Sequence, residues 1–272
     1  MRNPYRTQNI AFFFLLLATL LIVVPVGLIV VIIIQKGLPA INWQFLTDIP
    51  RQGMRAGGIF PAIVGTLYLV TGAVAFALPI GLLAAIYLSE YSKDTIINRI
   101  IMLYIVNLSG VPSVVYGLFG LALFVVFFKF GASILSGALT LGIMILPVII
   151  TTSREALESV PQSFREVSLS LGASKWQTIR HIVLPNAIPG ILTGTILGLG
   201  RAAGETAPIL FTVAAFYLPQ LPKSVFDQAM ALPYHLYVIS TQVPNVDEKI
   251  RYGTAFVLLA IVLIMNLVAI II

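Results

Sequence analysis

Two charged side chains, Arg201 and Glu205, interrupt a stretch that is otherwise uncharged from residue 188 to residue 217. On a helix, residues four positions apart are neighbours, so the guanidinium and the carboxylate can pair. Arginine presents a planar fork of donors that matches the oxygens of an oxyanion, and it stays charged at any working pH. The pair therefore predicts either a site that attracts an oxyanion or a structural ion pair that only fixes helix packing.

The composition shows what surrounds this pair. Of the 272 residues, 59% are hydrophobic and 10% are charged, and the mean hydropathy is +1.02. A soluble domain has about 25% charged residues, so this chain has too few charges to cover a globular surface, and its many aromatic and aliphatic residues exclude disorder. A membrane protein with several spans is predicted. A charge at the bilayer centre costs at least about 2.5–3.5 kcal/mol and normally faces a cavity or a partner.

Other chemistries are excluded by what the chain lacks. It has no cysteine, which rules out disulfides, thiol nucleophiles and cysteine-ligated metals. Its two histidines, His181 and His235, are too few for a histidine-based metal cluster. It has no G-x-x-x-x-G-K-[ST] loop for a nucleotide and no convincing Ser–His–Asp or paired-carboxylate arrangement. We therefore expect a chain with no cofactor and no catalytic activity of its own.

Six apolar runs provide the elements that would position the pair: about 10–34, 59–88, 100–128, 132–152, 188–217 and 252–272. Each run is long enough to be read as a membrane helix, so we predict an all-α polytopic protein with six transmembrane helices and both termini on one side. The net charge of +6 would suggest nucleic acid in a soluble protein. Here the basic residues are spread over loops, so no nucleic-acid partner is expected. They divide almost evenly between the two sides, and the positive-inside rule gives no orientation.

Small and hydroxyl residues inside the spans add two expectations. In the third run, Pro112 is expected to break the helix within the segment 109–113. In the fifth run, small residues recur every four positions and predict close approach of another helix; they are Gly190, Gly194, Gly198, Ala202 and Thr206. The hydroxyls of Ser109, Ser113 and Thr206 can line a pathway, although such groups in membrane helices more often bond to the backbone or to a neighbouring helix.

The longest polar stretch between spans, residues 153–185, predicts two short helices joined by a tight turn. Ser163 and Glu166 fit a capping box at the start of the first helix, and Gly172 is a left-handed stop at its end. Ser174 and Gln177 repeat the start signal, and Pro185 is expected to close the second helix. An apolar stripe on the second helix (Trp176, Ile179, Val183) can face the protein's own core or a partner. A helix-turn-helix tethered to the bilayer at both ends could hardly reach a DNA groove.

The spacing of this loop resembles the "EAA" loop of ABC importer permeases. Glu166-Val167-Ser168 is followed by Gly172 and then by Ile182-x-Leu184-Pro185, with Val and Ser in place of the two alanines. In that family the loop is cytoplasmic and docks on an ATP-hydrolysing subunit. The resemblance implies a type I importer permease (MetI-like) fold with cytoplasmic termini. It also implies a coupling role for a set of loop residues, namely Glu166, Gly172, Ala173, Trp176, Leu184 and Pro185.

A second resemblance narrows the family. The segments 109–117 (SGVPSVVYG) and 198–208 (GLGRAAGETAP) resemble phosphate-specific importer permeases of the PstA type. The likeness implies a domain organisation of residues 1–58 (first helix and periplasmic linker) and 59–272 (permease core with coupling loop 153–185). It also implies a bacterial inner-membrane location and a complex with a PstC-type permease, two ATPases that carry ATP and Mg, and a phosphate-binding protein. Four residues in the outer loops are expected to be aromatic anchors at the membrane interface or contacts for that binding protein: Trp43, Tyr234, His235 and Tyr237.

These residues lead to one hypothesis for the pathway. Arg201 transiently attracts phosphate, and Glu205 holds Arg201 when the path is empty and repels the anion onward when it is full. A permease of the same architecture for sulfate, molybdate or phosphonate is the first alternative, against which only the 201–208 segment argues. A self-sufficient ion-coupled carrier is the second, and the spacing of the docking loop disfavours it.

Overall fold

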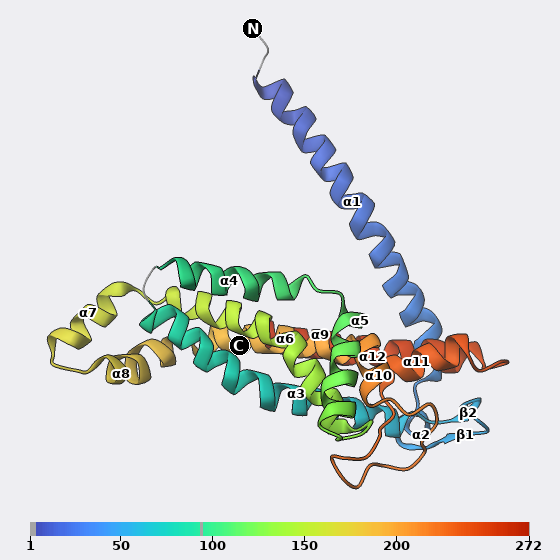
Figure 1. Ribbon diagram of the computed structural model, residues 1–272. Coiled ribbons are helices and arrows are strands. Elements are labelled where there is room, and N and C mark those ends of the chain that lie inside the picture. The colour runs from blue at the N-terminus through green and yellow to red at the C-terminus, as the bar shows by residue number, and fades with distance from the viewer. Residues whose placement is uncertain (1–3, 93–94, 272) are drawn as a thin grey trace.

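The computed structural model describes residues 4–92 and 95–271, and this part of the chain is built almost wholly from helices (Figure 1). Five continuous helical segments among these residues are long and apolar enough to cross a membrane. They contain α1 (Pro4–Gly37), α3 (Phe60–Ile86), α6 (Ile134–Glu158), α9 (Leu184–Gly204) and α12 (Glu248–Ile271). The predicted all-α membrane protein is confirmed, and the number of candidate spans among the described residues is six when one bent helix pair is counted as a single span.

The core lies where α3, α6 and α9 pack together. Small residues let α9 approach α6 closely, as the spacing predicts. A methyl group added at Gly190 would meet Ala156, one at Gly194 would meet the Thr152 side chain, and one at Gly198 would touch Ile145 and Ile149. The three glycines of the predicted ridge therefore form a contact surface with α6, whereas Thr206 lies beyond the end of α9.

The third apolar run is broken as predicted. It forms α4 (Ile96–Ser109), α5 (Ser113–Gly120) and the π-helical segment η3 (Leu121–Phe127), with a bend of 98° at the break. Pro112 lacks a backbone N–H and disfavours helical geometry in the residue before it, so the chain leaves one helix and starts another. The Tyr116 hydroxyl donates to the Leu108 carbonyl at 2.8 Å and fixes the two arms of the bend.

The fifth apolar run, predicted as a single span, is also broken. Helix α9 ends at Gly204, Glu205 is extended (φ −76°, ψ 131°), and a short helix α10 (Ala207–Thr212) follows. Pro208 stands four residues after Gly204, so in a continuous helix it would lose the bond to the Gly204 carbonyl and clash with it. The prediction of one uninterrupted helix through residue 217 was wrong for this reason.

The loop between α6 and α9 forms a helical hairpin: α7 (Gln162–Ser170), α8 (Lys175–Thr178) and the π-helical segment η4 (Ile179–Val183). We call residues 162–183 the coupling hairpin. Gly172 adopts φ +86°, the predicted left-handed turn. The capping box of Ser174 and Gln177 is present, with bonds of 2.7 and 3.3 Å. The box predicted at Ser163 is wrong, because α7 begins at Gln162, two residues before the start that a cap at Ser163 would give, and Pro161 is its N-cap.

Pro185 does not close the second helix of the hairpin. The helical segment runs on from Lys175 through η4 and α9 to Gly204. A π turn just before Pro185 shifts the hydrogen-bond pattern, so the missing proline N–H falls where the regular pattern is already interrupted. The Asn186 side chain donates to the Ile182 carbonyl at 2.6 Å, which satisfies an acceptor there. The hairpin is thus continuous with the membrane helix that carries Arg201.

The opposite end of the bundle holds short elements: η1 (Leu38–Ala40), α2 (Trp43–Thr47), an antiparallel pair β1 (Pro50–Arg51) and β2 (Ala56–Gly57), and α11 (Leu232–Thr241) (Figure 1). Tyr234 and His235 on α11 are buried, at 7% and 2% exposure. For these two residues the predicted role as interface anchors or partner contacts was wrong, since they pack inside this end of the protein. Trp43 on α2 and Tyr237 on α11 are 81% and 43% exposed, and for them the role stays a prediction. Helix α1 leaves the bundle and contacts α12 where Gly37 meets Tyr252 and Phe256.

Candidate functional site

Arg201 and Glu205, which we call the pathway pair, lie where α9 ends. Arg201 is in the last turn of the helix, and Glu205 is the residue that caps it. Arg201 Nε and Glu205 Oε1 are 3.7 Å apart, and the side chains are 36% and 19% exposed. A cation near a helix C-terminus interacts favourably with the backbone carbonyls there. The predicted ion pair is therefore present, but it sits at a helix break rather than inside a continuous helix.

The bent third span and the broken fifth span meet at this place. Helix α5 packs against α10, and a methyl group added at Gly117 would lie 3.0 Å from the Ala207 carbonyl oxygen and 2.8 Å from the Phe211 ring. Tyr116, next to Gly117, is buried and close enough to Arg201 to interact with it electrostatically. The fold thus brings the segments 109–117 and 198–208 together. Non-helical backbone at membrane depth occurs where it is buried in protein or lines a water-filled cavity.

The three predicted hydroxyl residues differ in their surroundings. Ser109 is exposed and donates to the Val106 carbonyl at 2.6 Å, the backbone bond that such residues commonly make. Ser113 is half-buried at the first position of α5, and Thr206 is half-buried just before α10. Ser113 and Thr206 therefore lie on the two segments that meet beside Arg201. A pathway role for all three hydroxyls remains a prediction.

The coupling hairpin exposes a face that is rich in apolar side chains. Phe164, Val167, Leu171 and Trp176 are 46%, 61%, 83% and 49% exposed, and Glu166 is exposed on the same short helix as Val167. The predicted apolar stripe on the second helix divides, because Ile179 and Val183 are buried in the core while Trp176 is exposed.

The remaining predicted coupling residues lie at the turn and at the base of the hairpin. Gly172 is exposed and Ala173 is half-buried in the turn, and at the start of α9 Leu184 is half-buried while Pro185 is exposed. Leu184 packs against the buried cluster of Ile179 and Val183. The predicted set is therefore spread over the length of the hairpin rather than gathered on its exposed apolar face.

Comparison with known families identifies this arrangement. Residues 77–272 match the family of binding-protein-dependent transport system inner membrane components. This chain belongs to that family. It is 35% identical over 258 residues to the probable ABC transporter permease YqgI of Bacillus subtilis, covering 90% of this chain and 87% of the relative. It is 38% identical over 215 residues to the phosphate transport system permease PstA 1 of Mycobacterium tuberculosis, covering 79% and 70%.

Solved structures agree on the fold of this permease. A bacterial ABC transporter that imports alginate superimposes with a TM-score of 0.61, covering 98% of this chain and 97% of the transporter chain. An inward-facing MetNI methionine ABC transporter gives 0.58, covering 78% and 94%. Both are 15% identical in sequence, so they show the fold alone. The type I importer permease fold expected from the sequence is confirmed.

Two residues near the pathway pair were missed by sequence reasoning. One is Tyr116, whose relation to Arg201 depends on the packing of two distant segments. The other is Asn266 in α12, which faces the permease's α9: a methyl group added at Gly200, next to Arg201, would lie 2.9 Å from Asn266 Oδ1. Asn266 is the only amide side chain in the last apolar run, and that was the available signal.

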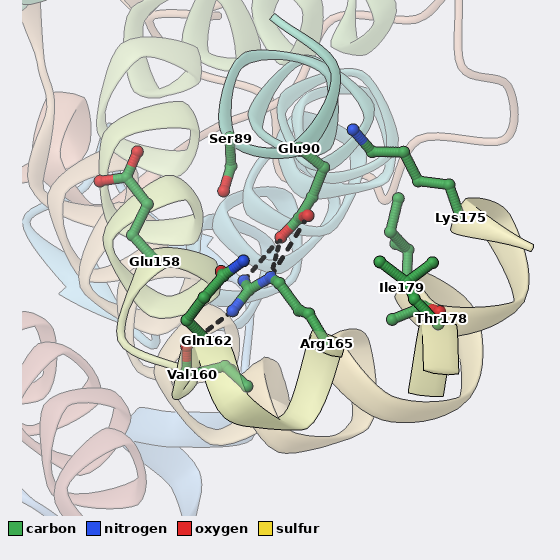
Figure 2. A pocket seen from close by; sticks show the side chains of 10 residues that line it. Ser89, Glu90, Glu158, Val160, Gln162, Arg165, Lys175, Thr178 and Ile179 are labelled. Atoms are coloured by element: carbon green, nitrogen blue, oxygen red, sulfur yellow. Dashed lines mark hydrogen bonds and ion pairs between the residues drawn. The ribbon is translucent and has the colours of Figure 1, made fainter. Parts of the chain in front are cut away.

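A third missed feature is the ion pair at the base of the coupling hairpin (Figure 2). Arg165 Nη2 and Glu90 Oε1 are 2.6 Å apart, and the side chains are only 12% and 8% exposed. The pair borders a cavity of about 450 Å³ between η2 (Tyr87–Tyr91), which continues α3, and the hairpin. Neither Arg165 nor Glu90 was singled out by a pattern in the sequence. Among the described residues, no cluster of acidic and histidine side chains could hold a metal ion.

Proposed function

We propose that this chain is the membrane-spanning subunit of an ATP-driven phosphate importer and forms half of the translocation pathway. The pathway pair carries the proposal: an arginine at a helix break inside the membrane portion, beside a carboxylate 3.7 Å away. Relatives named as phosphate transport permeases support the substrate. They include PstA 1 of Mycobacterium tuberculosis and a probable PstA of Methanocaldococcus jannaschii, which is 35% identical over 237 residues and matches 86% of this chain and 82% of the relative.

The chemistry follows from the two opposite charges. The Arg201 guanidinium offers paired donors to two oxygens of a phosphate, while Glu205 competes for the same donors. When the anion arrives, Arg201 exchanges the carboxylate for phosphate. When the anion leaves, the carboxylate takes its place and lowers the cost of emptying the site. Weak, reversible binding of this kind suits a pathway, because a tight site would trap the ion.

Energy comes from outside the chain in this proposal. The exposed apolar face of the coupling hairpin and Glu166 dock on a cytoplasmic ATPase subunit, which carries ATP and Mg. A complete complex contains two ATPases, a second permease of the PstC type and a phosphate-binding protein on the outer side. The termini are cytoplasmic, and this chain contributes neither a cofactor nor a catalytic group.

The proposal is tested by reconstituting the complex with its binding protein in vesicles and measuring ATP-driven uptake of labelled oxyanions. We expect phosphate, rather than sulfate, molybdate or phosphonate, to stimulate both uptake and ATP hydrolysis. Arg201→Ala abolishes uptake while the complex still assembles, and Arg201→Lys, which keeps the charge but loses the planar fork, gives an intermediate rate. Stimulation by another oxyanion would overturn the substrate, and normal uptake by Arg201→Ala would overturn the site.

A further inference from the structure

Both helices of the coupling hairpin hold the same short segment at the end of α3. From α7, Arg165 pairs with Glu90 of η2 through two contacts to Oε1, from Nη2 at 2.6 Å and from Nε at 3.1 Å. From α8, the Lys175 ammonium lies over the Tyr91 ring, 5.0 Å from its centre. The π-helical turn of η2 is therefore contacted by both helices of the coupling hairpin, the part of the protein proposed to dock on the cytoplasmic partner.

Arg165 also binds the end of a second membrane helix. Its Nη1 donates to the Val160 carbonyl at 2.7 Å, and its Nη2 donates to the Leu157 carbonyl at 2.8 Å. Leu157 lies in the last turn of α6, and Val160 follows it. Figure 2 shows the guanidinium between the Glu90 carboxylate and this backbone. One side chain thus joins the hairpin to both α3 and α6.

The hairpin itself behaves as one unit in this packing. The Ser168 and Thr178 hydroxyls, one on each arm, are 2.9 Å apart. Beneath them, Ile179 and Val183 pack against side chains from α3 and α6 in a single buried cluster whose other members include Ala85, Ile86, Leu157 and Val160. Displacing α7 without displacing the ends of α3 and α6 would require breaking these contacts together.

Burial distinguishes this ion pair from an ordinary surface pair. A buried pair is a poor stabiliser relative to apolar packing, but removing one partner leaves an uncompensated charge inside the protein. Its geometry is also strongly directional, because the guanidinium fork fixes the positions of three acceptors at once. The nearby pair of Arg154 and Glu158 on α6 is 30% and 47% exposed and joins residues of one helix, so it carries no such link.

We propose that Arg165 and Glu90 form a transmission pair, a positioning contact that makes α3 and α6 move with α7 when the ATPases close. This inference rests on the proposed coupling of ATP hydrolysis to transport. It assigns to Arg165 a role within the protein, separate from the exposed hairpin face that docks on the partner. Movement of the docked hairpin reaches two core membrane helices through one buried side chain.

The first test compares uptake with ATP consumption in the reconstituted complex. Glu90→Gln keeps the shape and an acceptor oxygen but removes the charge, and Arg165→Lys keeps the charge but cannot reach all three acceptors. We expect both variants to assemble and to hydrolyse ATP, while phosphate transported per ATP falls about tenfold for Glu90→Gln and less for Arg165→Lys. The matched control Arg154→Gln leaves the ratio unchanged. A loss of yield or thermal stability with an unchanged ratio would show a merely structural pair and overturn the proposal.

A second test depends on no transported solute. Because the chain has no cysteine, spin labels can be attached at Tyr87→Cys on η2 and Ser170→Cys on α7, both exposed. Double electron–electron resonance measures the distance between the two spin labels. We expect the same narrow distance distribution in the nucleotide-free and ATP-bound complexes, and a broad distribution after Glu90→Gln. A distance that changes by several ångströms between the two states in the otherwise unaltered chain would refute the rigid link. Absence of phosphate uptake by the unaltered complex would instead count against the proposed function.

Discussion

Neutralising the acidic member of the pathway pair separates attraction of the anion from its release. In Glu205→Gln the side chain keeps its size but no longer competes with phosphate for the Arg201 guanidinium. We therefore expect phosphate to remain longer in the membrane portion and the maximal rate of uptake to fall. Loss of a merely structural ion pair would lower the rate without increasing retention of the anion.

The magnitude follows from the geometry. Two unit charges 3.7 Å apart attract by about 4.5 kcal/mol at an effective dielectric constant of 20. Arg201 is 36% exposed, so solvent screening and side-chain entropy reduce the net value to about 0.5–1 kcal/mol, the upper part of the range for exposed pairs. Since about 1.4 kcal/mol corresponds to a factor of ten, retention should rise roughly 2- to 5-fold and the rate of release should fall by a similar factor.

The assay follows labelled phosphate in vesicles containing the complex. Retained label is measured by rapid filtration without the binding protein, and the maximal uptake rate is measured with it and ATP. Glu205→Asp serves as the control, because it keeps the charge and should retain phosphate much as the unaltered chain does. A slower rate with unchanged or weaker retention in Glu205→Gln would refute the idea that the carboxylate drives release.

Two further predictions concern packing and pH. Gly65→Ala places a methyl group on the Met230 carbonyl oxygen and should destabilise the protein by about 1–3 kcal/mol, seen as a lower unfolding temperature in detergent. Gly27→Ala, with open space around it, should have no such effect, and equal behaviour of the two would contradict the packing. Burial lowers the pKa of His235, on α11 outside the spans, from 6.5 to about 4. Its contribution to stability is full above pH 6.5 and is lost as pH falls toward 4, by about 3 kcal/mol. His235→Gln should flatten the difference in unfolding free energy over this range, and an unchanged pH dependence would show that His235 does not titrate there.

Local signals in the sequence were sufficient for several features of the structure. The spacing of Arg201 and Glu205 predicted their pairing, because residues four positions apart on a helix are neighbours, and the pair forms although Glu205 only caps α9. The four-residue repeat of small residues predicted that another helix approaches closely. It did not predict that this helix is α6. Gly172 and the capping box at Ser174 were predicted because each satisfies backbone geometry or hydrogen bonds within a few residues.

The remaining features depend on contacts that no local pattern contains. Arg165 and Glu90 are 75 positions apart, and only the packing of α7 on the end of α3 brings them together. Hydropathy predicted one span from 188 to 217 because the run is almost entirely apolar. Hydropathy does not register that Pro208 cannot bond to the Gly204 carbonyl, which is what ends the helix. Pro185 was predicted to end a helix because proline usually does. The π turn that lets the helix continue through Pro185 is not visible in the composition.

The continuity of the helix through Pro185 changes how the two sites relate. The segment from Lys175 to Gly204 is 30 residues long, about 45 Å at 1.5 Å per residue. One end is in the coupling hairpin, where Lys175 contacts Tyr91, and the other carries Arg201 in its last turn. A helix closed at Pro185 would have placed a flexible joint between them. Because the helical segment continues past Pro185, we predict that a tilt of the hairpin reaches the break at Glu205, which α10 follows and near which Tyr116 lies.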